Sequence, residues 1–241
     1  MSAGDDDAAR YHGIMRFMAR LVSHPDGVRD SHVRGQSPAM SWVDEVVAAI
    51  KAGEPVVLPT DTVYGLCADA YHEAPARQLA RLKGRPEGMP IALLAADLDV
   101  ILDAVPELRG RAAVLARALL PGPYTLVLPN PARRFRWLTG SNDHTIGIRV
   151  PALTGQTRAV LECVGAVAAT SANLHGTADP ARLEDVPETI ARAATALVDG
   201  GELPGAPSTV IDLTGPQPRV LREGAVPAHE ALATVARVAR G

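Results

Sequence analysis

A regular pattern of apolar and polar positions begins at Ser41. Ser41, with Asp44 three residues later, is typical of a helix N-terminal cap, and Gly53 is typical of the residue that follows a helix end. Between these signals, one apolar face of a helix is formed by Val43, Val46, Val47 and Ile50. The pattern therefore predicts a first helix between Ser41 and Gly53.

Short apolar runs and amphipathic segments alternate over the rest of the chain. The runs predict strands at 55–59, 90–95, 124–129, 145–150, 166–170, 195–199, 208–213 and 218–222. The amphipathic segments predict helices at 74–83, 98–105, 109–120, 155–164, 184–194 and 227–239. Interleaved strands and helices indicate an α/β fold, and the closely spaced last strands indicate an antiparallel portion. We expect a twisted, mixed parallel and antiparallel open sheet flanked by helices.

Residues 1–40 differ from the rest, because they combine an acidic run with scattered histidine, arginine, glycine and serine and lack a long apolar period. We expect an N-terminal extension at 1–40, largely irregular, followed by one ordered domain at 41–241. Apolar residues make up 47% of the 241 residues, enough for a sizeable core. The formal net charge of −3 argues against a protein that mainly coats a nucleic-acid backbone, but it leaves a local basic pocket open.

Several classes of site are missing from the sequence. It contains no phosphate-binding loop, dinucleotide fingerprint or nucleophile elbow, and no histidine and carboxylate spacing that predicts a bound metal. Its two cysteines, Cys67 and Cys163, match no metal or redox spacing, which is typical of reduced thiols in a cytoplasmic protein. No apolar run reaches the ~20 residues of a membrane span, and the start lacks a secretory signal, so no membrane partner is expected.

Polar clusters stand where the apolar runs stop or start. They are Thr60–Tyr64, Lys83–Pro86, Pro121–Thr125, Thr170–Asn173, Ser208–Thr209 and Arg222–Gly224, with Arg149 at the end of another strand. Ligands of open α/β sheets lie at strand ends, and these clusters supply cations, hydroxyls and tight turns. Lys83 and Arg85 suit a polyphosphate, although cations at a helix end also complement the helix dipole. Ser171 and Asn173 suit a ligand or a helix cap equally. Together the clusters favour a pocket for a phosphorylated ligand.

Taken in order, these clusters resemble the Sua5/YrdC/YciO family over about 42–225. The segments that carry the resemblance are PTDTVYGL (59–66), KGRP (83–86), PGPYTLVL (121–128), TIGIRVP (145–151), TSAN (170–173), STVIDL (208–213) and LREG (221–224). The resemblance implies a twisted mixed sheet with a concave basic pocket. It also implies synthesis of L-threonylcarbamoyl-AMP from L-threonine, bicarbonate and ATP with release of pyrophosphate, in the short single-domain form of the family. The product serves the N6-threonylcarbamoyl modification of adenosine 37 in tRNA through a downstream threonylcarbamoyl-transferase machinery.

The resemblance also assigns residues. It implies ATP contacts at Lys83, Arg85, Met89, Pro121, Ala169, Ser171, Asn173 and Arg222, with Lys83 and Arg85 as the catalytic cations. Threonine contacts are expected at Thr60, Thr62, Tyr64, Thr125, Arg149 and Ser208. We expect Mg²⁺ to arrive with ATP, since it is commonly held through substrate phosphates, and no metal site on the protein itself.

The chain departs from the family at Leu94, where many members carry a histidine, at Met89, where Lys or Asn is common, and at Cys67, where glycine is usual. Leu94 removes a polar contact from the threonine side. Two alternatives stay open: an RNA-binding module of the same fold, with weak contacts to tRNA or other RNA, and a carbamoyl-adenylating paralogue that uses another amine.

Overall fold

The computed structural model describes residues 41–240. Their strands form one continuous nine-stranded sheet, which helices flank. Its strands are β1 (Val56–Pro59), β2 (Tyr64–Asp69), β3 (Ala92–Ala95), β4 (Tyr124–Pro129), β5 (Thr145–Arg149), β6 (Ala166–Ser171), β7 (Ala196–Leu197), β8 (Thr209–Asp212) and β9 (Arg219–Arg222). Their order is β7-β1-β2-β6-β3-β5-β4-β8-β9. The pairs β1/β7, β3/β5 and β4/β8 are parallel and the other five pairs are antiparallel. The expected mixed sheet is therefore confirmed.

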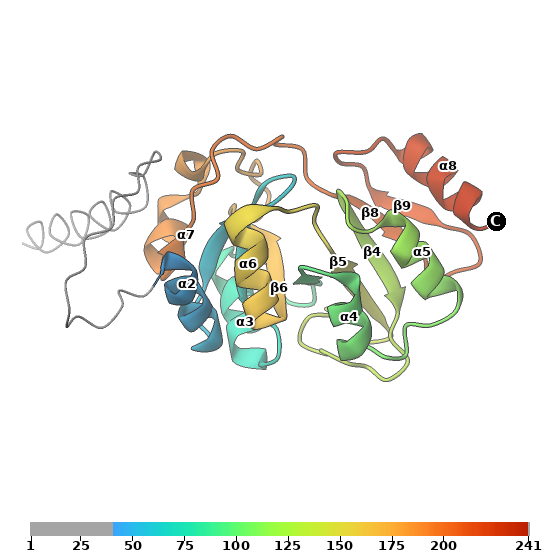
Figure 1. Ribbon diagram of the computed structural model, residues 1–241, viewed down its shortest axis with the longest axis horizontal. Coiled ribbons are helices and arrows are strands. Elements are labelled where there is room, and N and C mark those ends of the chain that lie inside the picture. Colours follow the sequence, from blue (N-terminus) through green and yellow to red (C-terminus); the bar gives the residue numbers. More distant parts are fainter. Residues whose placement is uncertain (1–40, 241) are drawn as a thin grey trace, which may run out of the picture.

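The helices gather in two groups. They are α2 (Trp42–Lys51), α3 (Glu73–Leu82), α4 (Leu98–Ala104), α5 (Arg111–Leu119), α6 (Gly155–Val164), α7 (Glu188–Ala193) and α8 (Ala228–Val238), with a short 3₁₀ helix at Leu183–Asp185. Figure 1 shows α2, α3, α6 and α7 at one end of the molecule and α4, α5 and α8 at the other, with β5 between them. The connection from β7 to β8 runs along one side of the molecule between the two ends (Figure 1).

The two faces of the sheet are covered to different extents. The larger apolar cluster joins one face to α3, α4, α5, α7 and α8, through residues such as Leu79, Ile101, Leu115, Ile190 and Val235. The smaller cluster joins the other face to α2 and α6, and its strand residues come from β1, β2, β3, β6 and β7. Among the described residues, no side chain of β4, β5 or β8 belongs to that smaller cluster. The second face is therefore left uncovered over β5, β4 and β8.

Most of the predicted elements are present within a few residues of their expected ends. The cap of α2 is confirmed: the Ser41 hydroxyl accepts from the backbone N–H of Asp44 at 3.2 Å, and the Asp44 carboxylate accepts from the backbone N–H of Ser41 at 3.1 Å. Gly53 follows the end of α2 with a φ of 81°. The expected extension at 1–40 lies outside the described residues.

Two expectations about elements are wrong. The first is that no strand lies between the strand at 55–59 and the helix at 74–83. The segment after β1 is instead a tight turn that leads back into β2, which pairs antiparallel with β1 from Pro59 opposite Tyr64. β2 was missed because its residues are buried on both faces, so they show no alternation of apolar and polar positions. The single helix expected at 184–194 is divided between the 3₁₀ helix and α7, because Pro187 caps α7 and cannot donate a backbone hydrogen bond within a continuous helix.

Candidate active site

A cavity of about 230 Å³ lies on the uncovered part of the sheet. Its floor is built by side chains that alternate with core residues along each strand, so that Thr125 and Val127 of β4 face the cavity while Leu126 and Leu128 are fully buried on the other face. The same alternation places Thr145, Gly147 and Arg149 of β5 in the cavity. Its walls come from the β1–β2 turn, Arg85, the end of β6 and the segment Pro207–Ser208. Arg222 lines the wall beside Ser208.

Arg149 is held by the turn between β1 and β2. Its Nη2 donates to the Asp61 carboxylate at 2.6 Å, to the Thr62 hydroxyl at 2.5 Å and to the Thr60 hydroxyl at 3.3 Å. The turn itself is closed by the Thr60 hydroxyl, which donates to the carbonyl of Val63 at 2.6 Å. Arg149 Nε is buried without a hydrogen-bond partner among the described residues. The ion pair and the two hydroxyls therefore fix the guanidinium through Nη2.

Arg222 and two hydroxyls form a second group. Arg222 Nη2 donates to the carbonyl of Ser208 at 2.8 Å, and the Ser208 hydroxyl lies 2.8 Å from the Thr125 hydroxyl. β8 and β9 are adjacent, with Val210 opposite Arg222, which brings this cation beside Ser208. The arrangement presents two hydroxyls and a cation at the β8 side of the cavity.

Arg85 stands on the opposite side, next to the end of β6. Its Nη1 donates to the Thr170 hydroxyl at 3.0 Å, and its Nη2 donates to the carbonyl of Pro90 at 2.7 Å. Its Nε is buried and, within residues 41–240, has no partner. Such an unpaired buried donor is costly unless a ligand accepts from it.

Lys83 lies behind this wall and does not line the cavity. Only 3% of it is exposed, and its Nζ donates to the carbonyl of Ser171 at 2.5 Å, the carbonyl of Asn173 at 2.7 Å and the Asn173 side-chain oxygen at 2.7 Å. These three contacts use the three donors of an ammonium group. Asn173 is further fixed by the Ser171 hydroxyl, which donates to its side-chain oxygen at 2.6 Å. Lys83 therefore holds the strand end that carries Ser171 in place.

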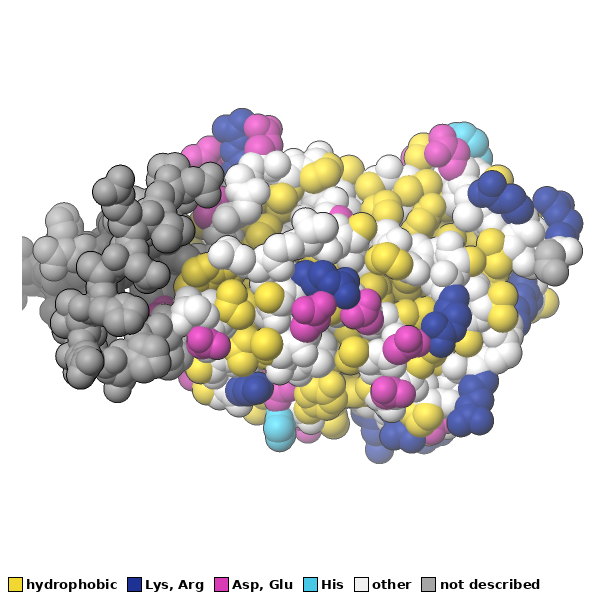
Figure 2. Space-filling view, in the orientation of Figure 1, with side chains coloured by type: hydrophobic (Ala, Val, Ile, Leu, Met, Phe, Trp, Pro, Cys, Tyr) yellow, Lys and Arg dark blue, Asp and Glu magenta, His cyan; other side chains and the backbone are white. Residues whose placement is uncertain are grey.

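Positive charges are concentrated in this region. Burial and then the charge of Arg222 lower the pKa of Arg85, whereas the pKa of Arg222 is lowered by burial and by Arg149 and raised by Asp179. Burial, with a smaller contribution from Arg85, lowers the pKa of Lys83 to about 8. Within the described part of the chain, neither Arg85 nor Arg222 forms an ion pair with a carboxylate. By contrast, the face shown in Figure 2 carries charges of both signs, with Lys and Arg most frequent at the end of the molecule that holds α4, α5 and α8. Mutual repulsion between cations that lack a paired carboxylate favours a bound anion.

The structure thus brings some of the predicted residues together around the cavity and places others elsewhere. The predicted residues that line the cavity are Thr60, Arg85, Thr125, Arg149, Ala169, Ser171, Ser208 and Arg222. Thr62 and Tyr64 are fully buried, Lys83 and Asn173 lie behind the wall, and Met89 and Pro121 are exposed outside it. The roles that the sequence assigns to these residues remain predictions.

Several cavity residues carry no polar signal that the sequence could have revealed. Ala92, Val127, Gly147 and Val210 belong to apolar runs, and only the alternation within each strand indicates that they face away from the core. Asp61 does not line the cavity but orients Arg149. Leu94 lines it and is 2% exposed.

No resident metal site is indicated by the described residues, since no group of three or more His, Cys, Asp or Glu side chains could hold an ion. Both cysteines are free thiols, with Cys67 buried and Cys163 exposed. Over residues 41–240, each helix is too short or too polar to cross a membrane.

A family model named Sua5_yciO_yrdC, with the description "Telomere recombination", matches residues 48–224. The threonylcarbamoyl-AMP synthase of Pyrococcus abyssi is 37% identical over 194 residues, which cover 78% of this chain and 56% of that protein. The threonylcarbamoyl-AMP synthase of Stenotrophomonas maltophilia is 34% identical over 163 residues, which cover 66% of this chain and 86% of that protein. The chain thus spans little more than half the length of the Pyrococcus relative.

The structural comparison agrees with the sequence comparison. The crystal structure of Pyrococcus abyssi Sua5 complexed with L-threonine has a TM-score of 0.73 and 34% sequence identity, and the match covers 80% of this chain and 56% of that one. The match to the family model at 48–224 includes all nine strands and the residues around the cavity.

Proposed function

Because the chain belongs to the Sua5/YciO/YrdC family, we propose that it makes L-threonylcarbamoyl-AMP from L-threonine, bicarbonate and ATP. The observation that carries this proposal is the cavity itself, whose lining within residues 41–240 gathers three guanidinium groups and a set of hydroxyls without a carboxylate. The names of the Pyrococcus and Stenotrophomonas relatives and the threonine in the Sua5 crystal structure support the choice of reaction.

The reaction needs little covalent chemistry from the protein. The amine of threonine combines with bicarbonate and loses water to give a carbamate. A carbamate oxygen then attacks the α-phosphorus of ATP, and the bond to the β-phosphate oxygen breaks to release pyrophosphate. The protein must hold two anionic reactants together and offset their charge, which preorganised cations do most effectively.

The cations divide naturally between the two substrates. Arg85 and Arg222 carry no carboxylate partner among residues 41–240 and would bind the polyphosphate of ATP, in bidentate fashion where the geometry allows. Arg149 is already paired with Asp61 through Nη2, so its other nitrogens suit a single carboxylate such as that of threonine. Thr60, Thr125 and Ser208 would receive the polar atoms of the amino acid. Lys83 would act through Ser171 and Asn173, which it fixes.

The metal enters as part of the nucleotide substrate. The cavity lining lacks the carboxylates that a resident divalent cation would need, and ATP is normally bound as its magnesium complex. The product is a mixed anhydride that transfers its threonylcarbamoyl group to an amine. We place the protein in the cytoplasm, where a threonylcarbamoyl-transferase acting on adenosine in tRNA would consume this product.

The test is an assay of pyrophosphate release with purified protein, magnesium and ATP, in which threonine or bicarbonate is omitted in turn. Release that requires both, together with an adenylate of the expected mass, would support the proposal. Pyrophosphate release at the same rate without threonine would refute it. Formation of an adenylate only with another amine would instead favour a carbamoyl-adenylating paralogue.

A further inference from the structure

Gly147 is a glycine that neither the backbone nor the packing of the protein requires. Ten of the glycines within residues 41–240 have a positive φ, which favours glycine, but Gly147 is not among them. Three further glycines are needed for space, because an added Cβ would lie within 3.0 Å of a neighbouring atom at Gly122, Gly200 and Gly224. A Cβ at Gly147 would meet only the Cγ2 atom of Thr125, at an ordinary contact distance of 3.8 Å.

The position of Gly147 in the sheet indicates why a glycine that the fold does not require is present there. It is the middle residue of β5, opposite Val127 of β4, and glycine inside a strand weakens the strand. On its other side, β3 runs parallel with Leu94 beside Arg149, which puts Ala92 next to Gly147. The missing side chain would point into the cavity, since Gly147 belongs to its lining. A strand glycine that faces a cavity and has free space above it is typical of a position where a ligand approaches the backbone closely.

The neighbours of Gly147 indicate which ligand lies above it. Arg149, two residues along the same strand face, and Thr125, 3.8 Å from an added Cβ, are both residues that we assign to the amino-acid substrate. Leu94, which lies beside Arg149, supplies an apolar wall. Arg85 and Ser171, assigned to ATP, lie instead on the side of the cavity next to β6.

We propose that Gly147 is a specificity-determining residue, whose lack of a side chain makes room for the side chain of the amino-acid substrate. The inference rests on the proposed function in its choice of substrate. A methyl group at this position fills part of the subsite, so that a β-branched amino acid such as threonine is excluded more strongly than the smaller serine. The protein itself tolerates the methyl group, because the nearest atom is at contact distance.

The experiment compares Gly147→Ala with the wild type by calorimetric titration of L-threonine, L-serine and MgATP, together with melting curves. We expect threonine affinity to fall about ten- to a hundredfold, the change that one methyl group makes in a tightly fitting pocket. Serine affinity should fall less, ATP affinity should stay at the wild-type value, and the melting temperature should be equal or higher. Gly215→Ala is the matched control, since Gly215 lies in the β8–β9 turn with its nearest atom, Gln217 O, 3.7 Å from an added Cβ.

Three results would overturn the inference: wild-type threonine affinity in Gly147→Ala, an equal loss of threonine and ATP affinity, or failure of the variant to fold. The first would show that the space is unused, the second that the whole cavity has collapsed, and the third that the protein itself needs the glycine. Failure of the proposed function is distinguishable, because a wild-type protein that binds threonine but releases no pyrophosphate would leave these binding measurements intact.

Discussion

At the scale of single residues, the cations of the cavity differ in whether they form an ion pair with a carboxylate. Arg149 is neutralised by Asp61, whose other oxygen accepts from the backbone N–H of Ala152 at 3.0 Å. Arg85 and Arg222 have no such partner in the described part of the chain, and burial lowers the pKa of both. An anionic ligand would relieve this repulsion, so their contribution to binding should exceed their contribution to folding.

Replacing Arg85 by Ala is expected to weaken ATP binding about ten- to a hundredfold, since a charge-assisted contact contributes about 1.5–3 kcal/mol. Calorimetric titration of MgATP measures this change. Arg77→Ala is the control: Arg77 belongs to α3, pairs with Glu73 on the surface and should leave ATP affinity unchanged. Wild-type ATP affinity in Arg85→Ala would exclude Arg85 from the nucleotide site.

Lys83 predicts a dependence on pH. Its pKa of about 8 means that the ammonium loses a proton just above neutrality, and a neutral amine has only two donors for its three close acceptors. ATP affinity should therefore fall as the pH rises through about 8. Titrations of MgATP between about pH 7 and pH 9 measure this effect. In Lys83→Gln, which cannot titrate, we expect weaker binding that is independent of pH over this range.

The stability of the protein is expected to change with pH in the opposite direction to ATP affinity. Because the pKa of Lys83 is lowered from 10.5 to about 8 on folding, the unfolded chain binds more protons between these values. This residue therefore makes the folded state more stable as the pH rises through that window, and its unfavourable contribution is fully present below about pH 8. A parallel loss of ATP affinity and of stability in this window would contradict the assignment to Lys83.

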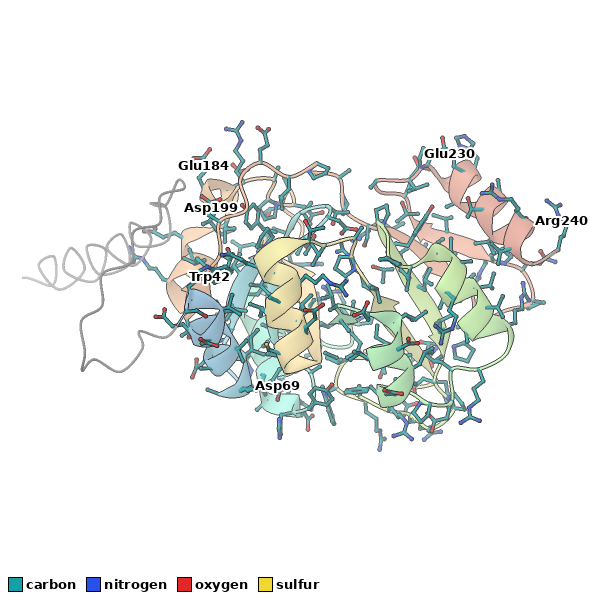
Figure 3. All side chains as sticks on the ribbon, in the orientation of Figure 1. Trp42, Asp69, Glu184, Asp199, Glu230 and Arg240 are labelled. Carbon is teal, nitrogen blue, oxygen red and sulfur yellow. The ribbon has the colours of Figure 1, made fainter. Side chains whose placement is uncertain are left out.

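At the scale of elements, the segment Asp199–Pro207 links the β7 edge of the sheet to the cavity. Tyr64, fully buried at the start of β2, accepts from the N–H of Gly200 at 2.9 Å and lies 2.8 Å from the carbonyl of Gly201. Asp199 lies next to the Tyr64 hydroxyl, at the start of β2, and Asp69 is at its end. Figure 3 accordingly shows Asp199 and Asp69 on opposite sides of this end of the molecule. Gly205 donates to the carbonyl of Thr62 at 2.9 Å. The segment is thus tied to the turn that orients Arg149, and it ends at Ser208.

Tyr64→Phe is expected to lower the free energy of unfolding by about 0.5–1.5 kcal/mol, because the buried side chain loses its hydrogen bonds to the backbone of Gly200 and Gly201. Hydrogen exchange of residues 199–205 should accelerate, and threonine affinity should fall because Ser208 follows this segment. Tyr71→Phe is the control, since Tyr71 is 44% exposed and water can replace its contact with Ala166. Unchanged exchange in Tyr64→Phe would show that the phenol does not hold the segment.

At the scale of the whole molecule, an uneven covering of one sheet produces the cavity. α2 and α6 pack on the half of one face that β1, β2, β3, β6 and β7 build, while helices cover the opposite face along its length. The uncovered half carries two threonines, a glycine and an arginine beside two valines: Thr125, Thr145, Gly147, Arg149, Val127 and Val210. The described core clusters and the cavity lining all lie between Trp42 and Val238.

Because residues 1–40 lack a long apolar period, their removal is expected to leave the melting temperature and pyrophosphate release of the protein close to those of the full chain. Differential scanning calorimetry and the pyrophosphate assay on both forms provide the measurement. A large drop in melting temperature would show that the extension packs as part of the domain. Loss of activity at unchanged melting temperature would assign it a role in substrate binding.

The sequence by itself determined the elements and the polar clusters between them. The apolar period of α2, its cap at Ser41 and the alternation in β4 and β5 are local features, and local periodicity reports which face of an element is apolar. The order of the motifs also pointed to the family that the comparisons show. The sequence pattern does not predict β2, because a strand that is buried on both faces shows no alternation of apolar and polar residues.

Only the tertiary structure decided which of the polar residues meet a ligand. β6 lies between β2 and β3 in the sheet, so the end of β6 comes to face Lys83 and Arg85 from a distant part of the chain. Lys83 turns to the backbone of Ser171 and Asn173, and Tyr64 to the β7–β8 segment, although both belong to polar motifs. Gly147 shows the reverse case, an apolar-run residue on the cavity floor. A sequence motif gives the type of each side chain. Whether that side chain is exposed to a ligand depends on what packs against it, which is set by the strand order and by the helices that cover each face of the sheet.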